Sequence, residues 1–324
     1  MKNENIARLV VLLFAAIGVA IPLVGRQLAL GNQNVIEIHA RMPENGGWSP
    51  DVIRAEIGQP IHLRITSDDV MHNFAVGKMD FEHVDIQPGE WTETTLTFDE
   101  PGRYTFYCTR WCGPNHWRMR GTIEVGDPQS NFEQPPPPLF VELGIDIDAP
   151  HVAADTPLSP PEPARGAAYI DRLPGDILEK ETYLNNSPDD LWAQLRADTS
   201  LSDLDDAALW DAVAYIWQAN SSPEALATAE ELYAINCSAC HGETGRGDGV
   251  MLRDLPVLEP YAMKHAATRP PDFGDPRILL GAKPVLLRGK IVRGGMGTQM
   301  PYWGPVLTDE EIDAVVAYFY SLAF

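Results

Sequence analysis

One short stretch constrains this chain more than any other, because its side chains together suit a metal ion. From Cys108 to Met119 the sequence reads Cys-Thr-Arg-Trp-Cys-Gly-Pro-Asn-His-Trp-Arg-Met, so that Cys112 and His116 fall between the two ends. Thiolate, imidazole and thioether donors favour copper, whereas calcium and magnesium prefer oxygen ligands. One cysteine, one histidine and one methionine would suit a mononuclear blue-copper site, with a second histidine from elsewhere. The alternative is a disulfide between the two cysteines of an exported protein.

The second cysteine of this stretch favours a binuclear site. The pattern Cys-x3-Cys-x3-His-x2-Met resembles the CuA loop of cytochrome oxidase subunit II, in which two thiolates bridge two coppers. The segment from Asp69 to Phe74, Asp-Val-Met-His-Asn-Phe, is similar to a D-V-x-H-x-F segment of the same family. The resemblance implies a CuA site with the following ligands: His72, Cys108, the backbone carbonyl of Arg110, Cys112, His116 and Met119.

The remaining two cysteines belong to a second motif. Cys237-Ser-Ala-Cys240-His241 matches the covalent attachment sequence of c-type haem. A thioredoxin-like redox pair is the alternative, but the adjoining histidine and the absence of a βαβ pattern argue against it. We therefore expect haem c, with His241 as one axial ligand of the iron.

The C-terminal part of the chain, residues 221–324, resembles a small class I cytochrome c. Its second axial ligand is expected many residues after the attachment sequence, where Met300 precedes a proline as in the Met-Pro loop of that family. Met296 and His265 are competing candidates. Ligation by methionine and histidine would raise the haem potential, as suits an electron carrier.

The segment that carries the metal loop shows the alternation of β-strands. Apolar and polar residues alternate in 35–41 and in 60–66, and Pro-Gly pairs at 88–89 and 101–102 separate further strand-like runs. Several short strands with turns between them predict a β-sandwich or Greek-key barrel. The resemblance to a cupredoxin covers this stretch, and we place a cupredoxin-like CuA domain at residues 32–127.

Between the two domains, residues 128–220 change in character. Proline-rich runs at 134–138 and 156–163 predict a semi-rigid spacer, and helical patterns return from about Ser187. A helix ending at Trp217 is similar in sequence to one ending at Tyr320. Residues 165–220 are therefore either the remnant of a second, haem-less cytochrome domain or an ordinary helical segment of similar composition.

The N-terminus carries an apolar run. Residues 9–25 form an uncharged run of 17 residues, a length at the short end of what is needed to span a membrane. Lys2 and Arg8 precede this run. We expect residues 1–31 to form a single retained transmembrane anchor in the cell membrane. Its N-terminus would be cytoplasmic and the soluble domains periplasmic or extracytoplasmic. A signal peptide cleaved after Ala20 is the alternative. The expected fold class is thus multidomain, with a transmembrane helix, an all-β cupredoxin-like Greek-key domain and an all-α cytochrome c domain.

The charge balance limits the partners. The chain has 46 acidic and 24 basic residues and a formal net charge of −22. Such a charge argues against nucleic-acid binding and favours a basic partner, although it could serve solubility alone.

Taken together, the motifs imply an electron relay without catalytic residues of its own, because both expected centres have their positions filled by protein ligands. The resemblance implies the redox subunit of a haem–copper oxidase. It would pass electrons from an external cytochrome c or blue-copper protein through haem c and CuA to an integral-membrane catalytic subunit that reduces O2. The equivalent subunit of a CuA-type nitric-oxide reductase and a free-standing membrane-anchored carrier stay open as alternatives.

Overall fold

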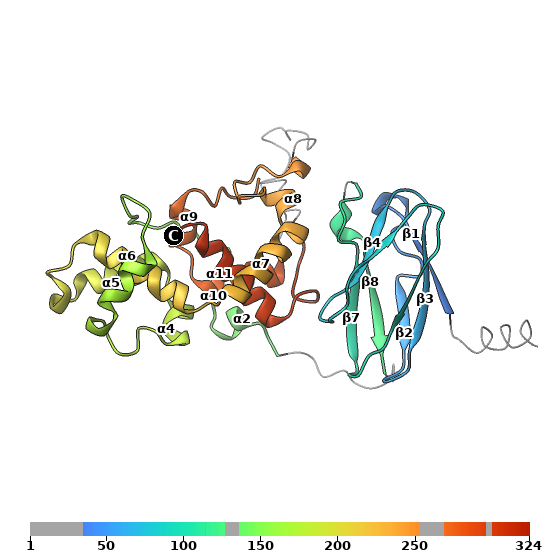
Figure 1. The fold of residues 1–324 in the computed structure, drawn as a ribbon, viewed down its shortest axis with the longest axis horizontal. Coiled ribbons are helices and arrows are strands. Elements are labelled where there is room, and N and C mark those ends of the chain that lie inside the picture. The colour runs from blue at the N-terminus through green and yellow to red at the C-terminus, as the bar shows by residue number, and fades with distance from the viewer. Residues whose placement is uncertain (1–34, 114, 127–135, 253–268, 296–299) are drawn as a thin grey trace, which may run out of the picture.

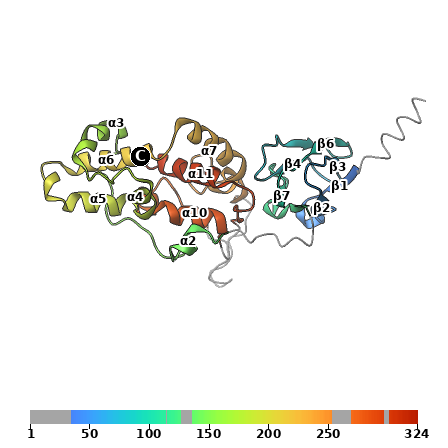
Figure 2. The same cartoon turned by 90° about the horizontal axis from the view of Figure 1, so that it is seen from below.

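A computed structural model of the chain describes residues 35–113, 115–126, 136–252, 269–295 and 300–324. These residues form a β body at the N-terminal side and a helical body at the C-terminal side, which lie beside each other in two perpendicular views (Figures 1 and 2). The expected anchor at 1–31 lies outside the described residues. Of the helices that are described, none is both long and apolar enough to cross a bilayer.

The β body consists of two sheets. The first has the order β1-β3-β6 and the second the order β2-β8-β7-β4-β5. Strand β1 pairs parallel with β3, and β2 pairs parallel with β8, while the other neighbours are antiparallel. The strands have these bounds: β1 Val35–Ala40, β2 Val52–Ala55, β3 Ile61–Ser67, β4 His72–Val76, β5 Val84–Ile86, β6 Thr92–Leu96, β7 Gly102–Tyr107 and β8 Arg120–Val125.

The alternation in the sequence decides which strand faces are buried. In β3, Ile61, Leu63 and Ile65 are at most 5 % exposed, and their neighbours His62 and Arg64 lie on the other face. Aromatic rings fill the space between the sheets, with Phe74 and Phe106 at 5.4 Å between centroids. These features confirm the predicted cupredoxin-like β fold.

The helical body contains ten helices within the described residues. They have these bounds: α2 Leu139–Glu142, α3 Pro163–Gly166, α4 Lys180–Asn185, α5 Pro188–Ala197, α6 Asp206–Ala219, α7 Pro223–Asn236, α8 Ser238–His241, α9 Pro276–Leu280, α10 Pro284–Arg293 and α11 Asp309–Ser321. Helix α7 packs on α11 through Tyr233, whose ring contacts those of Tyr318 and Phe319. An all-α domain follows the β domain, as predicted.

The segment 128–220, expected as a proline-rich linker followed by a helical segment, packs on the cytochrome segment from residue 136 onward. Buried side chains of this segment and of the cytochrome segment form one continuous hydrophobic core, which includes Leu191 and Val213 together with Leu279 and Val315. Helix α6 also contacts the C-terminal helix directly, since the Trp217 and Tyr320 rings lie 5.8 Å apart. Burial of so many apolar side chains outweighs the proline-rich composition. The part of the expected linker at 128–135 lies outside the described residues.

The two similar helices α6 and α11 each pack against an earlier helix. Gly166 of α3 lies so close to α6 that a Cβ atom there would overlap the backbone of Asp211. Helix α7 packs on α11, and its Ala229 is fully buried in the helical core. A haem-less cytochrome remnant at 165–220 stays a prediction.

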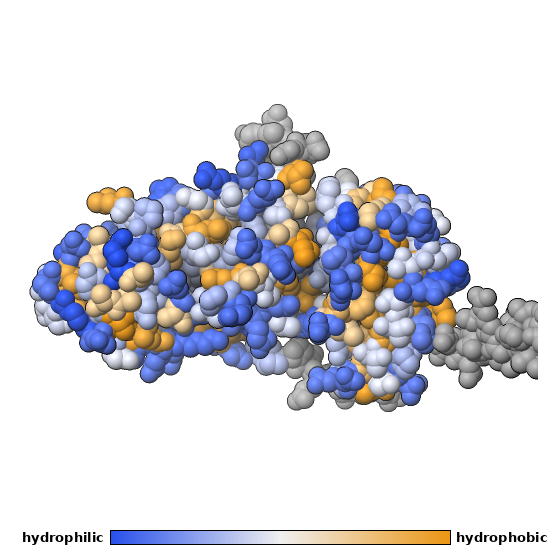
Figure 3. All heavy atoms as spheres, in the orientation of Figure 1, coloured by the Kyte–Doolittle hydropathy of each residue, from blue (hydrophilic) through white to orange (hydrophobic). Residues whose placement is uncertain are grey.

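The β body and the helical body touch through backbone as well as side chains. The N–H of Lys78 donates to the carbonyl of Val306 at 3.0 Å, and Tyr107 of β7 packs on the helical core. Figure 3 shows hydrophobic residues scattered among hydrophilic ones on one face of both bodies. The contact between the bodies therefore combines main-chain hydrogen bonding with the burial of an aromatic side chain.

Candidate metal and haem sites

Three adjacent strands bring the predicted copper ligands to one end of the larger sheet. His72 is the first residue of β4, Cys108 directly follows β7, and Met119 directly precedes β8. Because β7 lies between β4 and β8 and is antiparallel to both, these three positions fall at the same end of the sheet. The topology thus positions residues that lie far apart in the sequence.

The loop between β7 and β8 folds back on itself at two residues with positive φ. Gly113 has a φ of 142° and Asn115 a φ of 54°, and glycine and asparagine are the residues that adopt such values most readily. A short 3₁₀ helix, η2 (His116–Arg118), follows. The reversal returns His116 to Cys112, with 3.3 Å between Nδ1 and Sγ.

All six predicted copper ligands meet in this region. His72 Nδ1 lies 3.8 Å from Cys108 Sγ, which in turn lies 3.2 Å from the carbonyl oxygen of Arg110. On the other side, Cys112 Sγ lies 3.9 Å from Met119 Sδ. The donor atoms of His72, Cys108 and Cys112 are all within 4.8 Å of one another. Buried sulfur and imidazole donors at this spacing are a chemical fit for copper.

The two thiols of this cluster are free and share their environment. A hydrogen bond from Cys112 lowers the pKa of Cys108 despite its burial, and contacts with His116 and His72 add to this effect. The same contact raises the pKa of Cys112, because a second negative charge beside the first is unfavourable and the site is buried. The protein alone therefore keeps one proton on the pair, which a metal cation would displace.

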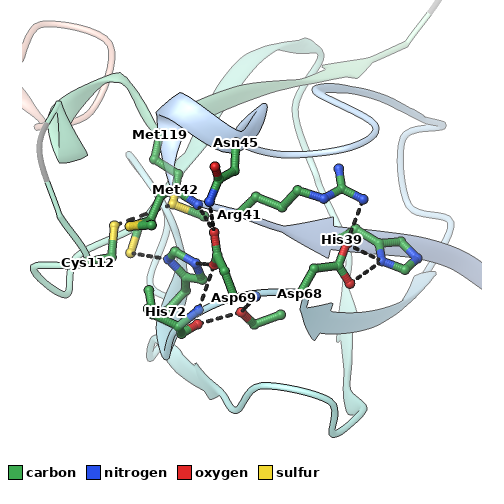
Figure 4. A network of polar contacts seen from close by, with 12 residues as sticks. His39, Arg41, Met42, Asn45, Asp68, Asp69, His72, Cys112 and Met119 are labelled. Atoms are coloured by element: carbon green, nitrogen blue, oxygen red, sulfur yellow. Dashed lines mark hydrogen bonds and ion pairs between the residues drawn. The ribbon is translucent and has the colours of Figure 1, made fainter.

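Asp69 orients His72, and its role was missed by the sequence analysis. The His72 Nε2 atom lies 2.8 Å from the Asp69 carboxylate (Figure 4), whereas the other ring nitrogen, Nδ1, faces Cys108 Sγ. A carboxylate on the outer nitrogen of a metal-binding histidine fixes the ring and its tautomer. The sequence did contain a signal for this role, namely that Asp69 lies three residues before His72.

Other donors hold the Asp69 carboxylate in place. The side chain of Asn45 donates at 2.9 Å, and the backbone N–H groups of Met42 and Val70 donate at 2.7 Å each. Burial opposes ionisation, but hydrogen bonds from Asn45, His72 and the two backbone groups lower the pKa of Asp69 to about 2. Asp69 is therefore ionised at neutral pH and can stabilise a histidine that binds a cation.

The predicted haem attachment residues lie on helix α8 and its flanks. Burial raises the pKa of Cys237 to about 12 and also raises that of Cys240. Burial lowers the pKa of His241 to about 4, so that its imidazole is neutral at pH 7 and able to bind a metal. The His241 ring stacks on Phe273 at 5.4 Å, and its Nδ1 atom is buried without a hydrogen-bond partner in the described residues. Two free, half-buried cysteines beside a neutral imidazole fit a c-type haem.

The predicted distal ligand lies at the start of the last described segment. Met300 packs partly buried on the helical core, and its carbonyl accepts a hydrogen bond from the N–H of Gly295 at 3.1 Å. The competing candidates Met296 and His265 lie outside the described residues. Pro301, the residue after Met300, lines a cavity together with Cys240.

That cavity connects the two candidate sites. It has a volume of about 320 Å³ and is lined from the β body by Cys108 and Met119 and from the helical body by Cys240 and Pro301. Trp111 also lines it and is 42 % exposed, with its ring 5.9 Å from that of His116. The copper-type cluster and Cys240 of the haem attachment sequence therefore open on one space between the bodies.

Comparisons with known families match the two halves of the chain separately. Residues 49–125 match the family described as cytochrome C oxidase subunit II, periplasmic domain. Residues 224–319 match the family described as cytochrome C oxidase, cbb3-type, subunit III.

Individual relatives agree with the first match. Cytochrome c oxidase subunit 2 of Thermus thermophilus is 39 % identical over 79 residues, which cover 24 % of this chain and 58 % of that protein. The protein of the same name from a second Thermus thermophilus strain is also 39 % identical and is covered to 46 % of its length. The chain thus spans about half the length of the curated relatives that it matches.

Solved structures with a similar fold include two oxidase proteins. One is a haem–copper terminal oxidase dimer, with a TM-score of 0.26 and 20 % identity over 39 % of this chain and 99 % of that chain. The other is the periplasmic domain of subunit II of cytochrome oxidase from Bradyrhizobium japonicum, with a TM-score of 0.25 and 18 % identity over 29 % of this chain and 84 % of that chain. From the two family matches, residues 49–125 are similar to the periplasmic domain of cytochrome C oxidase subunit II, and residues 224–319 are similar to cytochrome C oxidase, cbb3-type, subunit III.

Proposed function

We propose that this chain is the subunit through which electrons enter a haem–copper terminal oxidase. It would accept electrons from an external donor, carry them through haem c and CuA, and deliver them to an integral-membrane subunit that reduces O2. The single observation that carries the proposal is the common cavity, on which Cys108 and Met119 open from one side and Cys240 from the other.

The proposed copper ligands are the six residues gathered at the ends of β4, β7 and β8: His72, Cys108, the Arg110 carbonyl, Cys112, His116 and Met119. In this assignment Cys108 and Cys112 would hold the copper pair through sulfur, and His72 and His116 would hold it through Nδ1. The contacts between Nδ1 and sulfur on both sides of the cluster support this arrangement. Asp69 would fix the His72 ring without binding copper.

The proposed haem ligands are Cys237 and Cys240 as thioether attachments, with His241 and Met300 as axial ligands. When bound, haem c and the copper pair supply one-electron redox chemistry. The chain's own residues would hold both groups beside one cavity and would exclude water from most of the copper-donor atoms, since His72, Cys108, Cys112 and Met119 are at most 8 % exposed. No catalytic residue is assigned.

The proposed setting is the outer face of a cell membrane. Residues 1–31 would anchor the chain with a cytoplasmic N-terminus, and both described bodies would be periplasmic or extracytoplasmic. The catalytic subunit would be the membrane partner. The donor would be a basic cytochrome c or blue-copper protein, which the net charge of −22 attracts over a distance.

Two pairs of cysteine variants test the assignment. In the full chain, Cys108→Ser with Cys112→Ser should remove the electron paramagnetic resonance signal of one electron shared by two coppers, and should leave covalent haem in place. Cys237→Ala with Cys240→Ala should have the opposite effect. Each pair is the matched control for the other, because each removes two free cysteines from one of the two sites. A native chain with one copper and the spectrum of a mononuclear site would refute the binuclear assignment.

A further inference from the structure

Arg120 stands between the two candidate sites, although its sequence position suggests only the start of a strand. It directly follows Met119 and is the first residue of β8. Its guanidinium nevertheless reaches the helical body, where Nη1 donates to the carbonyl oxygen of Tyr302 at 2.6 Å. The same group lies over two rings of that body, 5.0 Å from the centroid of Tyr302 and 5.1 Å from that of Trp303.

The residues that Arg120 contacts belong to the segment of the predicted distal haem ligand. Tyr302 and Trp303 follow Met300 and Pro301 in the sequence. Arg120 follows the proposed copper ligand Met119 in the sequence. Its side chain therefore links the copper loop to the residues that follow the proposed haem ligand Met300. An arginine suits this place because its planar group can donate a hydrogen bond and stack on aromatic rings at once.

The rest of the contact depends on close approach of the two backbones. Lys78 N–H donates to Val306 O at 3.0 Å, and a Cβ atom at Gly77 would lie 2.6 Å from the same oxygen. Such a close backbone contact leaves little room for the β body and the helical body to slide past each other. Arg120 provides the long polar side chain that fixes the second edge of this interface.

We propose that Arg120 is a positioning residue for electron transfer between the two bodies. It holds the helical body in one orientation against the copper loop, so that an electron passes within the chain. This inference rests on the proposed function. The step that it positions is the transfer of one electron from reduced haem iron, which is oxidised, to the copper pair, which is reduced, with no bond formed or broken.

The chain supplies a matched control on the other side of Met119. Arg118 is exposed and lies over its neighbour Trp117 at 5.3 Å, within the β body. Arg120→Gln and Arg118→Gln each remove one positive charge next to the same methionine, but only the first removes contacts with the helical body. The copper loop should survive both changes, because backbone hydrogen bonds of Met119 to His116 and Cys108 fix it at 2.9 and 3.2 Å.

Two measurements on the full chain test the proposal. Hydrogen exchange of the Lys78 amide, measured without copper, should become about tenfold faster in Arg120→Gln, because the interface opens locally more often. In the loaded protein, electron transfer from haem to copper after photoreduction should slow by about tenfold, since an undocked body meets the copper loop only as often as its tether allows. Arg120→Lys should recover part of the rate, and Arg118→Gln should match the native chain in both measurements.

Copper content, the copper resonance spectrum and the haem spectrum should be unchanged in every variant. These controls separate this inference from the proposed function, whose failure would appear as missing copper or haem in the native chain. Unchanged exchange at Lys78 in Arg120→Gln would overturn the inference. Faster exchange with an unchanged transfer rate would also overturn it, because the residue would then stabilise the interface without positioning the two sites.

Discussion

Replacing Asp69 by alanine is expected to weaken copper binding, although Asp69 is not itself a proposed ligand. The carboxylate accepts hydrogen bonds from His72 Nε2 at 2.8 Å and from the N–H groups of Met42 and Val70 at 2.7 Å. Alanine would leave the imidazole without a partner on its outer side and several donors unpaired.

The size of the effect follows from these contacts. Loss of an outer carboxylate typically weakens metal binding by about 10–100-fold, which is about 1.4–2.8 kcal/mol. The copper-free protein should also lose about 1–3 kcal/mol of unfolding free energy, since each unpaired donor costs about 1 kcal/mol. Water will hydrogen-bond to some of the donors that lose Asp69 and so reduce the loss of unfolding free energy, because the Asp69 side chain is 16 % exposed.

The neighbouring aspartate provides the control. Asp68 is hydrogen-bonded to His39 Nδ1 at 2.9 Å and forms an ion pair with Arg41 at 2.6 Å, and its side chain is 35 % exposed. Figure 4 shows both carboxylates, and of the two only Asp69 reaches His72. Exposed ion pairs contribute about 0–1 kcal/mol, so Asp68→Ala should leave copper affinity unchanged.

A competition titration against a copper chelator of known affinity measures the difference, and denaturant unfolding of the copper-free chains gives the stability change. If both alanine variants bind copper as tightly as the native chain, Asp69 does not orient His72. If both weaken binding equally, the effect comes from lost negative charge, and the argument from geometry is wrong.

Three further predictions concern packing, pH and the copper loop. Gly166→Val should lower the unfolding free energy by about 1–3 kcal/mol, because its side chain would overlap the backbone of α6; Gly175→Val, in open space, should change it far less in denaturant unfolding. Hydrogen bonding from Arg293 lowers the pKa of Asp148 from its ordinary 3.8, so the stabilisation from this pair is present above about pH 4 and is lost as pH falls below it. Asp148→Asn should therefore reduce the acid sensitivity of the unfolding midpoint, and an unchanged pH profile would contradict this. Arg110→Ala should keep two coppers per chain by elemental analysis, because the proposed ligand is the backbone carbonyl; loss of one copper would show that the side chain is required.

Local patterns in the sequence predicted local structure well. Alternating residues in β3 predicted which side chains are buried. The sequence Thr308-Asp-Glu-Glu311 is that of a capping box, and the structure contains it, with Glu311 N–H donating to Thr308 Oγ1 at 3.1 Å and Thr308 N–H donating to Glu311 at 2.7 Å. The sulfur and imidazole donors of the copper-type site stand out by their chemistry and spacing within two short segments, whereas the Arg110 carbonyl was implied only by the family resemblance.

Contacts between distant segments could not be predicted in the same way. The proline-rich runs at 134–138 and 156–163 predicted a semi-rigid spacer, whereas the segment from residue 136 onward contributes buried side chains to the helical core. Proline content is a local signal, and burial against distant helices is not. The contact of Arg120 with Tyr302 spans 182 residues, and neither residue type marks an interface by itself. Such pairings depend on the relative placement of two folded bodies.

The central claim is that one chain carries an electron from haem c to CuA by itself. The most direct test is the rate of that transfer in the full chain after photoreduction of the haem, measured over a wide range of protein concentration. The account predicts a first-order rate constant that does not change with concentration, because the two sites open on one cavity. A rate that rises in proportion to concentration would show that electrons pass between molecules, and would contradict the account.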